Sequence, residues 1–158
     1  MKKLEIRMLA EFFGAQLPAS KIKNREVRID IVRLYGSHAK ANKEIGEEME
    51  DLRKNLVGDK EEELKKYSDL LQKANDEKLD EKERKKAKKE ADAMTECVKI
   101  DQDFREAANK LFEEDSDADI KKVSLETLYE ALCDCGFSGF AQELPIAAVE
   151  ANFANVIA

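Results

Sequence analysis

The stretch that decides the fold is residues 21–57, which read KIKNREVRIDIVRLYGSHAKANKEIGEEMEDLRKNLV. Apolar residues and one histidine recur there at steps of three and four, namely Val27, Ile31, Leu34, His38, Ala41, Ile45, Met49, Leu52 and Leu56. This spacing puts one side chain per turn on a single face of a helix. It predicts one helix about 55 Å long with a coiled-coil seam, since each helical residue rises about 1.5 Å.

The long helix is expected to end at Gly58. Asp59 then caps a shorter helix over residues 60–74, and Glu62 completes a capping box three residues later. The sequence that follows is so polar that it cannot bury enough surface to be core. We therefore expect an exposed tip over about residues 58–90.

Another long helix is expected to return from this tip. Asp80 and Glu83 cap it, and it runs to about Glu114. Its seam consists of Ala87, Ala91, Met94, Val98, Phe104, Ala108 and Leu111. Residues 21–114 thus predict a long antiparallel helical hairpin, in which the two sets of seam residues form the interaction seam.

The chain ends are expected to meet and form the base of this hairpin. Residues 1–40 carry nine basic and four acidic side chains, whereas residues 93–158 carry five and fourteen. Their opposite net charges attract each other. The alternation at Leu4 and Ile6 permits a short strand, which would pair with the segment Ile120–Val123.

Aromatic residues from both ends should share one core. Phe12 and Phe13 are expected against Phe137, Phe140 or Phe153, because neither end alone offers enough apolar residues to fold.

The fold class predicted is all-α, with at most a minor two-stranded β element. We expect a single domain over all 158 residues. In it, residues 1–20 and 115–158 form the base and residues 21–114 the projecting hairpin. Ser124 is predicted to cap a helix within the base.

Composition narrows the classes of function. The formal net charge is −7, so nucleic-acid binding by the whole molecule is unfavourable. No apolar run approaches the roughly 20 residues that cross a bilayer. Glu5, Arg7 and Glu11 interrupt any signal-like start, so we expect a protein of the host cytoplasm or of a virion that is not secreted.

An acidic loop is the one candidate metal site. Asp115, Asp117, Asp119 and Glu126 occupy positions 1, 3, 5 and 12 of an EF-hand calcium loop. Position 6 should be glycine and is Ile120, which disfavours the required turn. A solvated loop is the alternative that we favour, and no cofactor is expected.

Cysteine and histidine residues form no convincing site. A zinc site could take three sulfurs and one imidazole from Cys97, Cys133, Cys135 and His38. However, Cys133 and Cys135 would point about 200° apart on a helix, so both cannot easily face one metal ion. Three cysteines in a chain with no export signal indicate reduced thiols. His38 lies on the seam, where a packed histidine is a better interpretation than a general base. The chain is therefore expected not to be an enzyme.

A basic patch is predicted in the tip. It comprises Lys82, Arg84, Lys85, Lys86, Lys88 and Lys89. It can contact an acidic partner or nucleic acid, but it has no aromatic residue for base stacking. A solvated helix face is the simpler interpretation.

The chain resembles small helical-hairpin proteins of tailed bacteriophages, a family without assigned chemistry. The matching residues are Leu4, Ile6, Leu17, Pro18, Ala19, Phe104, Leu111, Ile120, Val123, Ser124, Leu125 and Leu128, with an Ala-Val-Glu element at 148–150. The tip departs from the family pattern. The resemblance implies a phage or prophage origin and a helical hairpin, and it brings no catalytic residue.

The function predicted is a non-enzymatic one that depends on protein–protein contacts. We expect a homo-oligomer or a complex with another phage or host protein, with no membrane partner. Virion assembly, or a structural or accessory role, is the first hypothesis. The alternatives are an inhibitor of a bacterial defence system, acting on a protein or as a small-ligand sponge, and an EF-hand-like calcium module.

Overall fold

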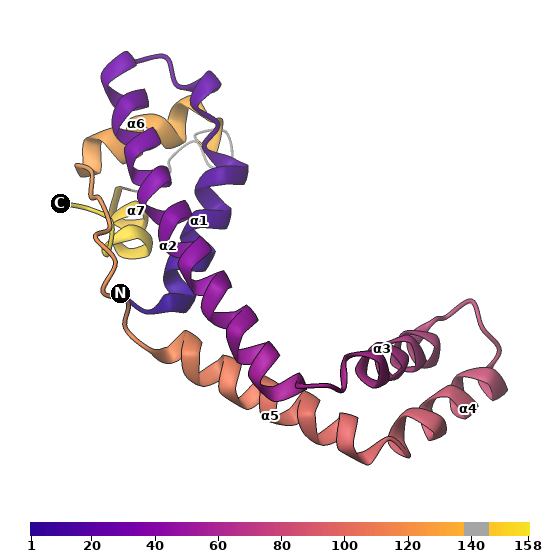
Figure 1. Cartoon of the computed structure of the whole chain (residues 1–158). Coiled ribbons are helices and arrows are strands. Elements are labelled where there is room, and N and C mark those ends of the chain that lie inside the picture. The colour runs from indigo at the N-terminus through magenta and orange to yellow at the C-terminus, as the bar shows by residue number, and fades with distance from the viewer. Residues whose placement is uncertain (138–145) are drawn as a thin grey trace. The chain divides into compact units, whose positions relative to one another are not determined.

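A computed structural model describes residues 1–137 and 146–158 (Figure 1). This part of the chain contains α-helices, one short 3-10 helix and no strand, so the predicted all-α class is confirmed. The elements are α1 (Lys3–Gln16), η1 (Ala19–Lys21), α2 (Arg25–Val57), α3 (Glu61–Asn75), α4 (Glu81–Asp92), α5 (Thr95–Glu113), α6 (Leu125–Asp134) and α7 (Ile146–Phe153).

The chain contains two compact units, and its organisation as one domain with a base and a projecting hairpin stays a prediction. Unit 1 comprises Met1–Gly46 and Phe112–Ala158, and unit 2 comprises Glu47–Leu111. The first part of α2 therefore belongs with the chain ends. An antiparallel pairing of α2 with α5 along their whole lengths stays a prediction.

The seam of α2 accounts for the core of unit 1. Six seam residues are buried, namely Val27, Ile31, Leu34, His38, Ala41 and Ile45. Met49, Leu52 and Leu56, which belong to unit 2, are half-buried. The helix begins at Arg25, later than predicted, because the Asn24 side chain accepts a hydrogen bond from Glu26 N at 3.0 Å and caps it.

The N-terminal segment is a helix, and the predicted strand at Leu4 and Ile6 is wrong. Ile6, Ala10 and Phe13 are buried, and Leu17 continues the same helical spacing. That longer pattern of steps of four and three overrides the short alternation on which the strand prediction rested. As a consequence, Leu4 faces away from the core and is exposed.

The chain ends nevertheless meet within unit 1. Lys3 N donates to Glu114 O at 3.0 Å, and within the C-terminal end Val123 N donates to Val156 O at 3.0 Å. These contacts give two isolated bridges, not a ribbon of two strands. Ile6 packs with Ala118 and Ile120, as expected for the N-terminal segment.

The predicted aromatic core is also present. The ring centroids of Phe12 lie 5.7 Å from Phe137 and 5.4 Å from Phe153, and Phe13 lies 6.3 Å from Phe153. The predicted contact at Phe140 falls outside the described residues.

Unit 2 contains a helical hairpin formed by α3 and α4 (Figure 1). Its core consists of Tyr67, Leu70, Ala87, Ala91 and Cys97. Of these residues Tyr67, Leu70 and Ala87 lie within residues 58–90, so the expected exposed tip is wrong at these three positions. Because the side chains of Ala87 and Ala91 are small, α4 lies close to α3. A few apolar residues are then enough to fill the interface between these two helices.

Helix boundaries in unit 2 correct two further predictions. Lys60, not Asp59, precedes α3, whereas Gly58 ends α2 with a φ of 55° as a helix-terminating glycine does. The helix expected from Asp80 to Glu114 is broken after Asp92. Met94 N donates to Ala91 O, three residues back, so the hydrogen bonds at the end of α4 are of the tighter 3-10 type and the helix ends before α5 begins.

Candidate interaction surfaces

His38 is a packed core residue. It is fully buried, its Nδ1 lies 2.9 Å from Leu34 O, and its ring meets the Phe13 ring edge-on at 5.2 Å. Nδ1 must donate to the carbonyl, so the unprotonated Nε2 has no partner among the described residues. Burial lowers the His38 pKa, and the bond to Leu34 only partly opposes this. A neutral imidazole held by a backbone carbonyl lacks the orienting carboxylate of a general base.

The acidic segment does not form the EF-hand loop that the sequence suggested as a candidate. Asp115 lies 3.2 Å from Lys2 Nζ, and Asp119 lies 2.6 Å from Lys121 Nζ. These bonds to lysines lower the pKa of both carboxyl groups. Ile120, where a calcium loop needs glycine, packs instead against the buried side chains around Ile6.

No metal site is found in the described part of the chain, where no three His, Cys, Asp or Glu side chains gather. The four candidate calcium ligands are thus not brought together, and neither are His38 and the cysteines of the zinc alternative. Cys97 lies in the core of unit 2, and Cys133 and Cys135 lie at the end of α6 in unit 1. Burial raises the pKa of Cys97 and Cys135, so both thiols stay protonated.

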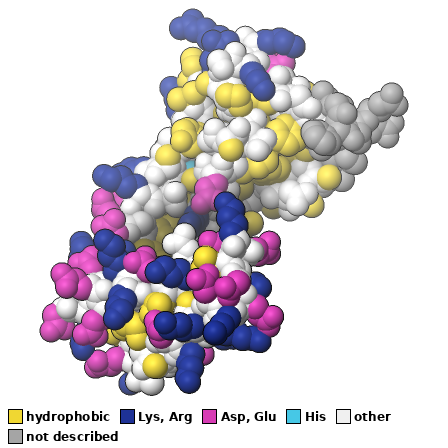
Figure 2. All heavy atoms as spheres, turned by 90° about the vertical axis from the view of Figure 1, so that its right-hand side faces the viewer, with side chains coloured by type: hydrophobic (Ala, Val, Ile, Leu, Met, Phe, Trp, Pro, Cys, Tyr) yellow, Lys and Arg dark blue, Asp and Glu magenta, His cyan; other side chains and the backbone are white. Residues whose placement is uncertain are grey.

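The basic patch of α4 is interleaved with carboxylates. Lys85 pairs with Glu81 at 2.6 Å, and Lys86 lies 4.0 Å from Glu90. Basic and acidic side chains alternate over unit 2 in the lower part of Figure 2. This pattern is typical of a solvated helix face more than of a phosphate-binding surface.

An exposed apolar surface lies on unit 1, and the sequence analysis missed it. Two of its residues are on α1, Leu4 (46% exposed) and Met8 (61%), and three are on α2, Ile29 (39%), Val32 (50%) and Tyr35 (41%). We call Ile29, Val32 and Tyr35 the outer face of α2. They recur every three residues: Ile29 and Val32 lie on the side away from the buried seam, whereas Tyr35 lies at the edge of that seam with its ring close to Gly14 of α1. This three-residue spacing is visible in the sequence, but the more regular apolar repeat of the seam is the more prominent pattern.

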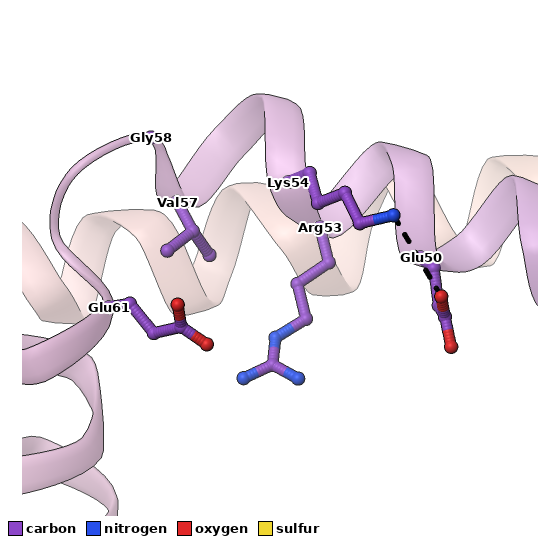
Figure 3. A pocket seen from close by; sticks show the side chains of 6 residues that line it. All are labelled: Glu50, Arg53, Lys54, Val57, Gly58 and Glu61. Atoms are coloured by element: carbon purple, nitrogen blue, oxygen red, sulfur yellow. Dashed lines mark ion pairs between the residues drawn. The ribbon is translucent and has the colours of Figure 1, made fainter.

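Unit 2 contains an open groove made of two adjoining hollows. The first, of about 250 Å³, is lined by Glu50, Arg53, Lys54, Val57, Gly58 and Glu61 (Figure 3). The second, of about 230 Å³, is lined by Arg53, Val57, Leu64, Tyr67, Ser68, Leu71, Ile100, Asp101 and Phe104. Arg53 and Val57 line both, so the two hollows are neighbours; we call them together the groove.

The groove has an apolar floor and a charged edge. Five large apolar residues in it are half-buried, namely Val57, Leu64, Leu71, Ile100 and Phe104. Figure 3 shows the Arg53 side chain extending from the helix between Glu50 and Glu61, while Lys54 pairs with Glu50 at 3.9 Å. A surface of this kind suits apolar side chains of a partner with charges around them.

A third hollow, of about 440 Å³, lies in unit 1 between α2 and the segment 118–121. The Ser37 hydroxyl joins its two walls, since it donates to Leu34 O at 2.8 Å and accepts from Lys121 N at 3.1 Å. Its charged residues pair locally, Lys40 with Glu44 and Lys121 with Asp119. Charges satisfied in this way do not select a ligand.

Comparison of the chain with protein-family models, curated proteins and solved structures finds no match. None of the described helices combines the length and apolar character needed to span a bilayer.

Proposed function

We propose that this chain is a non-enzymatic helical protein that works by binding other protein chains, as a structural or accessory component of phage assembly. The observation that carries the proposal is the exposed apolar surface of α1 and α2. Five large apolar side chains on two helices of one unit are left partly in water. Three of them, Ile29, Val32 and Tyr35, follow one another along α2, and an exposed apolar surface on a small protein often marks an interaction site.

The ionisable groups of unit 1 support a role without catalysis. The carboxyl groups whose pKa is lowered, Asp115, Asp119 and Asp134, each face a lysine that holds a neighbouring segment or turn. Shifted pKa values often mark catalytic sites, but structural ion pairs also produce them. The phage setting comes from the resemblance stated above.

Site-specific photocrosslinking in cells that produce the phage tests the proposal. A photoreactive residue at Met8 should form adducts with a protein chain, whereas one at the exposed Gln72 is the matched control. A phage structural protein or this chain itself in the adduct supports assembly, and a host immune protein supports the inhibitor alternative. A chain that sediments as an 18.0 kDa monomer both in lysate and after purification, with no adduct at Met8, contradicts the proposal.

A further inference from the structure

We infer that the second hollow of the groove binds a small apolar carboxylate, with the apolar body of the ligand in the hollow and its carboxylate on Arg53. The site lies wholly within unit 2 and shares no residue with the exposed apolar surface of unit 1, on which the proposed function rests. The inference therefore goes beyond the proposed function, and the two are tested by different experiments.

The walls of the second hollow are apolar and come from three helices. They are formed by Val57 on α2, Leu64 and Leu71 on α3, and Ile100 and Phe104 on α5. All five are half-buried, so each keeps apolar surface that the core of unit 2 does not cover. At about 230 Å³ the hollow is smaller than the roughly 300–1,000 Å³ of pockets for drug-sized molecules, so it suits a ligand of few atoms.

The two charged residues of this hollow differ in whether they are paired. Asp101 is held by Arg105 at 2.9 Å. Arg53 makes no ion pair or hydrogen bond with any described residue, and Figure 3 shows an ion pair from Lys54 to Glu50 but none from Arg53. An unpaired guanidinium beside apolar walls favours a carboxylate, which it binds through two parallel hydrogen bonds.

The carboxylates next to Arg53 in the first hollow do not take this place. Glu50 lies 3.9 Å from Lys54, and Glu61 lines the first hollow but not the second. Both are exposed, so water and salt screen their charges. A ligand carboxylate held against the apolar walls is screened less, so it interacts more strongly with the guanidinium.

Hydroxyl groups add hydrogen-bond donors to the second hollow. Tyr67 lines it and is only 8% exposed, and its hydroxyl bonds to no described residue. The hydroxyl oxygen keeps some exposed surface, unlike the buried and unpartnered Nε2 of His38. Burial raises the pKa of Tyr67 and the nearby Asp101 adds to this, so the phenol keeps its proton and donates. Ser68, exposed on α3, supplies another hydroxyl.

The unpaired polar groups of the hollow define the class of ligand. Arg53, Tyr67 and Ser68 can all donate, so the ligand must accept hydrogen bonds. An alcohol is a weaker acceptor than a carboxylate, and an amine would be repelled by the guanidinium. One carboxylate on a short apolar body satisfies both the walls and the donors.

Titration of the full chain with octanoate, followed by amide chemical shifts in two-dimensional NMR, tests the site. Octanoate carries one carboxylate on an apolar chain, and 1-octanol and octylamine have the same chain with other head groups. Below the concentration at which octanoate forms micelles, we expect saturable shifts around residues 53–57, 64–71 and 100–104. Octanoate should bind roughly tenfold or more tightly than either analogue, because only octanoate makes charged hydrogen bonds to the guanidinium.

Arg53→Gln and Lys54→Gln form a matched pair of variants. Both residues are exposed on α2 and both changes remove one positive charge, but Lys54 is already paired with Glu50 and lines only the first hollow. We expect Arg53→Gln to weaken octanoate binding about tenfold and Lys54→Gln by about twofold at most. Tyr67→Phe removes only the hydroxyl and should weaken it about threefold. Circular dichroism checks that each variant folds.

Three results would overturn the inference: no saturable shift at these residues, equal binding of octanoate and its analogues, or equal losses in Arg53→Gln and Lys54→Gln. Shifts confined to Leu4, Met8 and the outer face of α2 would overturn it as well, since they would show a general affinity of apolar chains for exposed apolar surface. None of these results bears on the crosslink at Met8, which tests the proposed function separately.

Discussion

Leu34→Ala is the substitution that most directly tests the packing of unit 1. Leu34 has no exposed surface, and it shares a core cluster with Phe13 on α1 and with Leu128 and Leu132 on α6. The change removes three carbons, worth roughly 2.4 kcal/mol at about 0.8 kcal/mol each. The cavity adds a further cost, because its walls belong to three helices that cannot all close on it, so we expect a total of about 3–4 kcal/mol.

Urea unfolding followed by far-ultraviolet circular dichroism measures this loss, and native-state hydrogen exchange locates it. Protection should fall in α1 and α6 of unit 1. Val32→Ala is the matched control on the same helix, since Val32 is half exposed, and it should change the stability by no more than about 0.5 kcal/mol. Equal losses for the two variants would refute the assignment of the inner and outer sides of α2.

Three further predictions follow from single residues. Burial lowers the pKa of His38, the chain's one histidine, so near pH 6.5 the imidazole binds a proton in the unfolded chain but not in the folded one. The free energy of unfolding should therefore be highest above that pH and fall as the pH drops below it. In His38→Leu the urea midpoint should lose this pH dependence. Ser124→Ala removes the acceptor for Thr127 N and should cost about 1 kcal/mol in thermal unfolding, whereas Ser20→Ala should cost little. Gly58→Ala should destabilise by about 1 kcal/mol because of its positive φ, whereas Gly46→Ala, which lies inside α2 with open space around it, should stabilise by a similar amount.

The parts of the fold that could be predicted from the sequence are those with a long, regular period. The seam of α2 repeats over nine positions, and the cap at Ser124 and the stop at Gly58 have a direct stereochemical cause. The strand prediction at the N-terminus is wrong because the alternation at Leu4 and Ile6 is shorter than the helical repeat that continues through Phe13 and Leu17.

The break between α4 and α5 and the buried tip could not be predicted in the same way. Ala87, Ala91 and Met94 fit one continuous helix by spacing, and nothing in that spacing marks the end at Asp92. Alanine scores as weakly apolar in a single sequence. In the structure, two alanines set how closely α4 approaches Tyr67 and Leu70, which depends on tertiary contact and not on local pattern.

The candidate interaction surfaces were hidden for a different physical reason. The buried seam alone explains the apolar periodicity of α2. The weaker repeat of Ile29, Val32 and Tyr35 is not needed to predict or to stabilise the helix, so it does not stand out in the sequence. The groove is assembled from three helices, and no segment contains its pattern. Because the outer face contributes little to the core, its residues can be changed while Leu34 and its neighbours keep unit 1 folded. We therefore expect Val32→Glu to leave the stability of unit 1 unchanged, so that any loss of binding to a partner protein in this variant would report on the exposed surface alone.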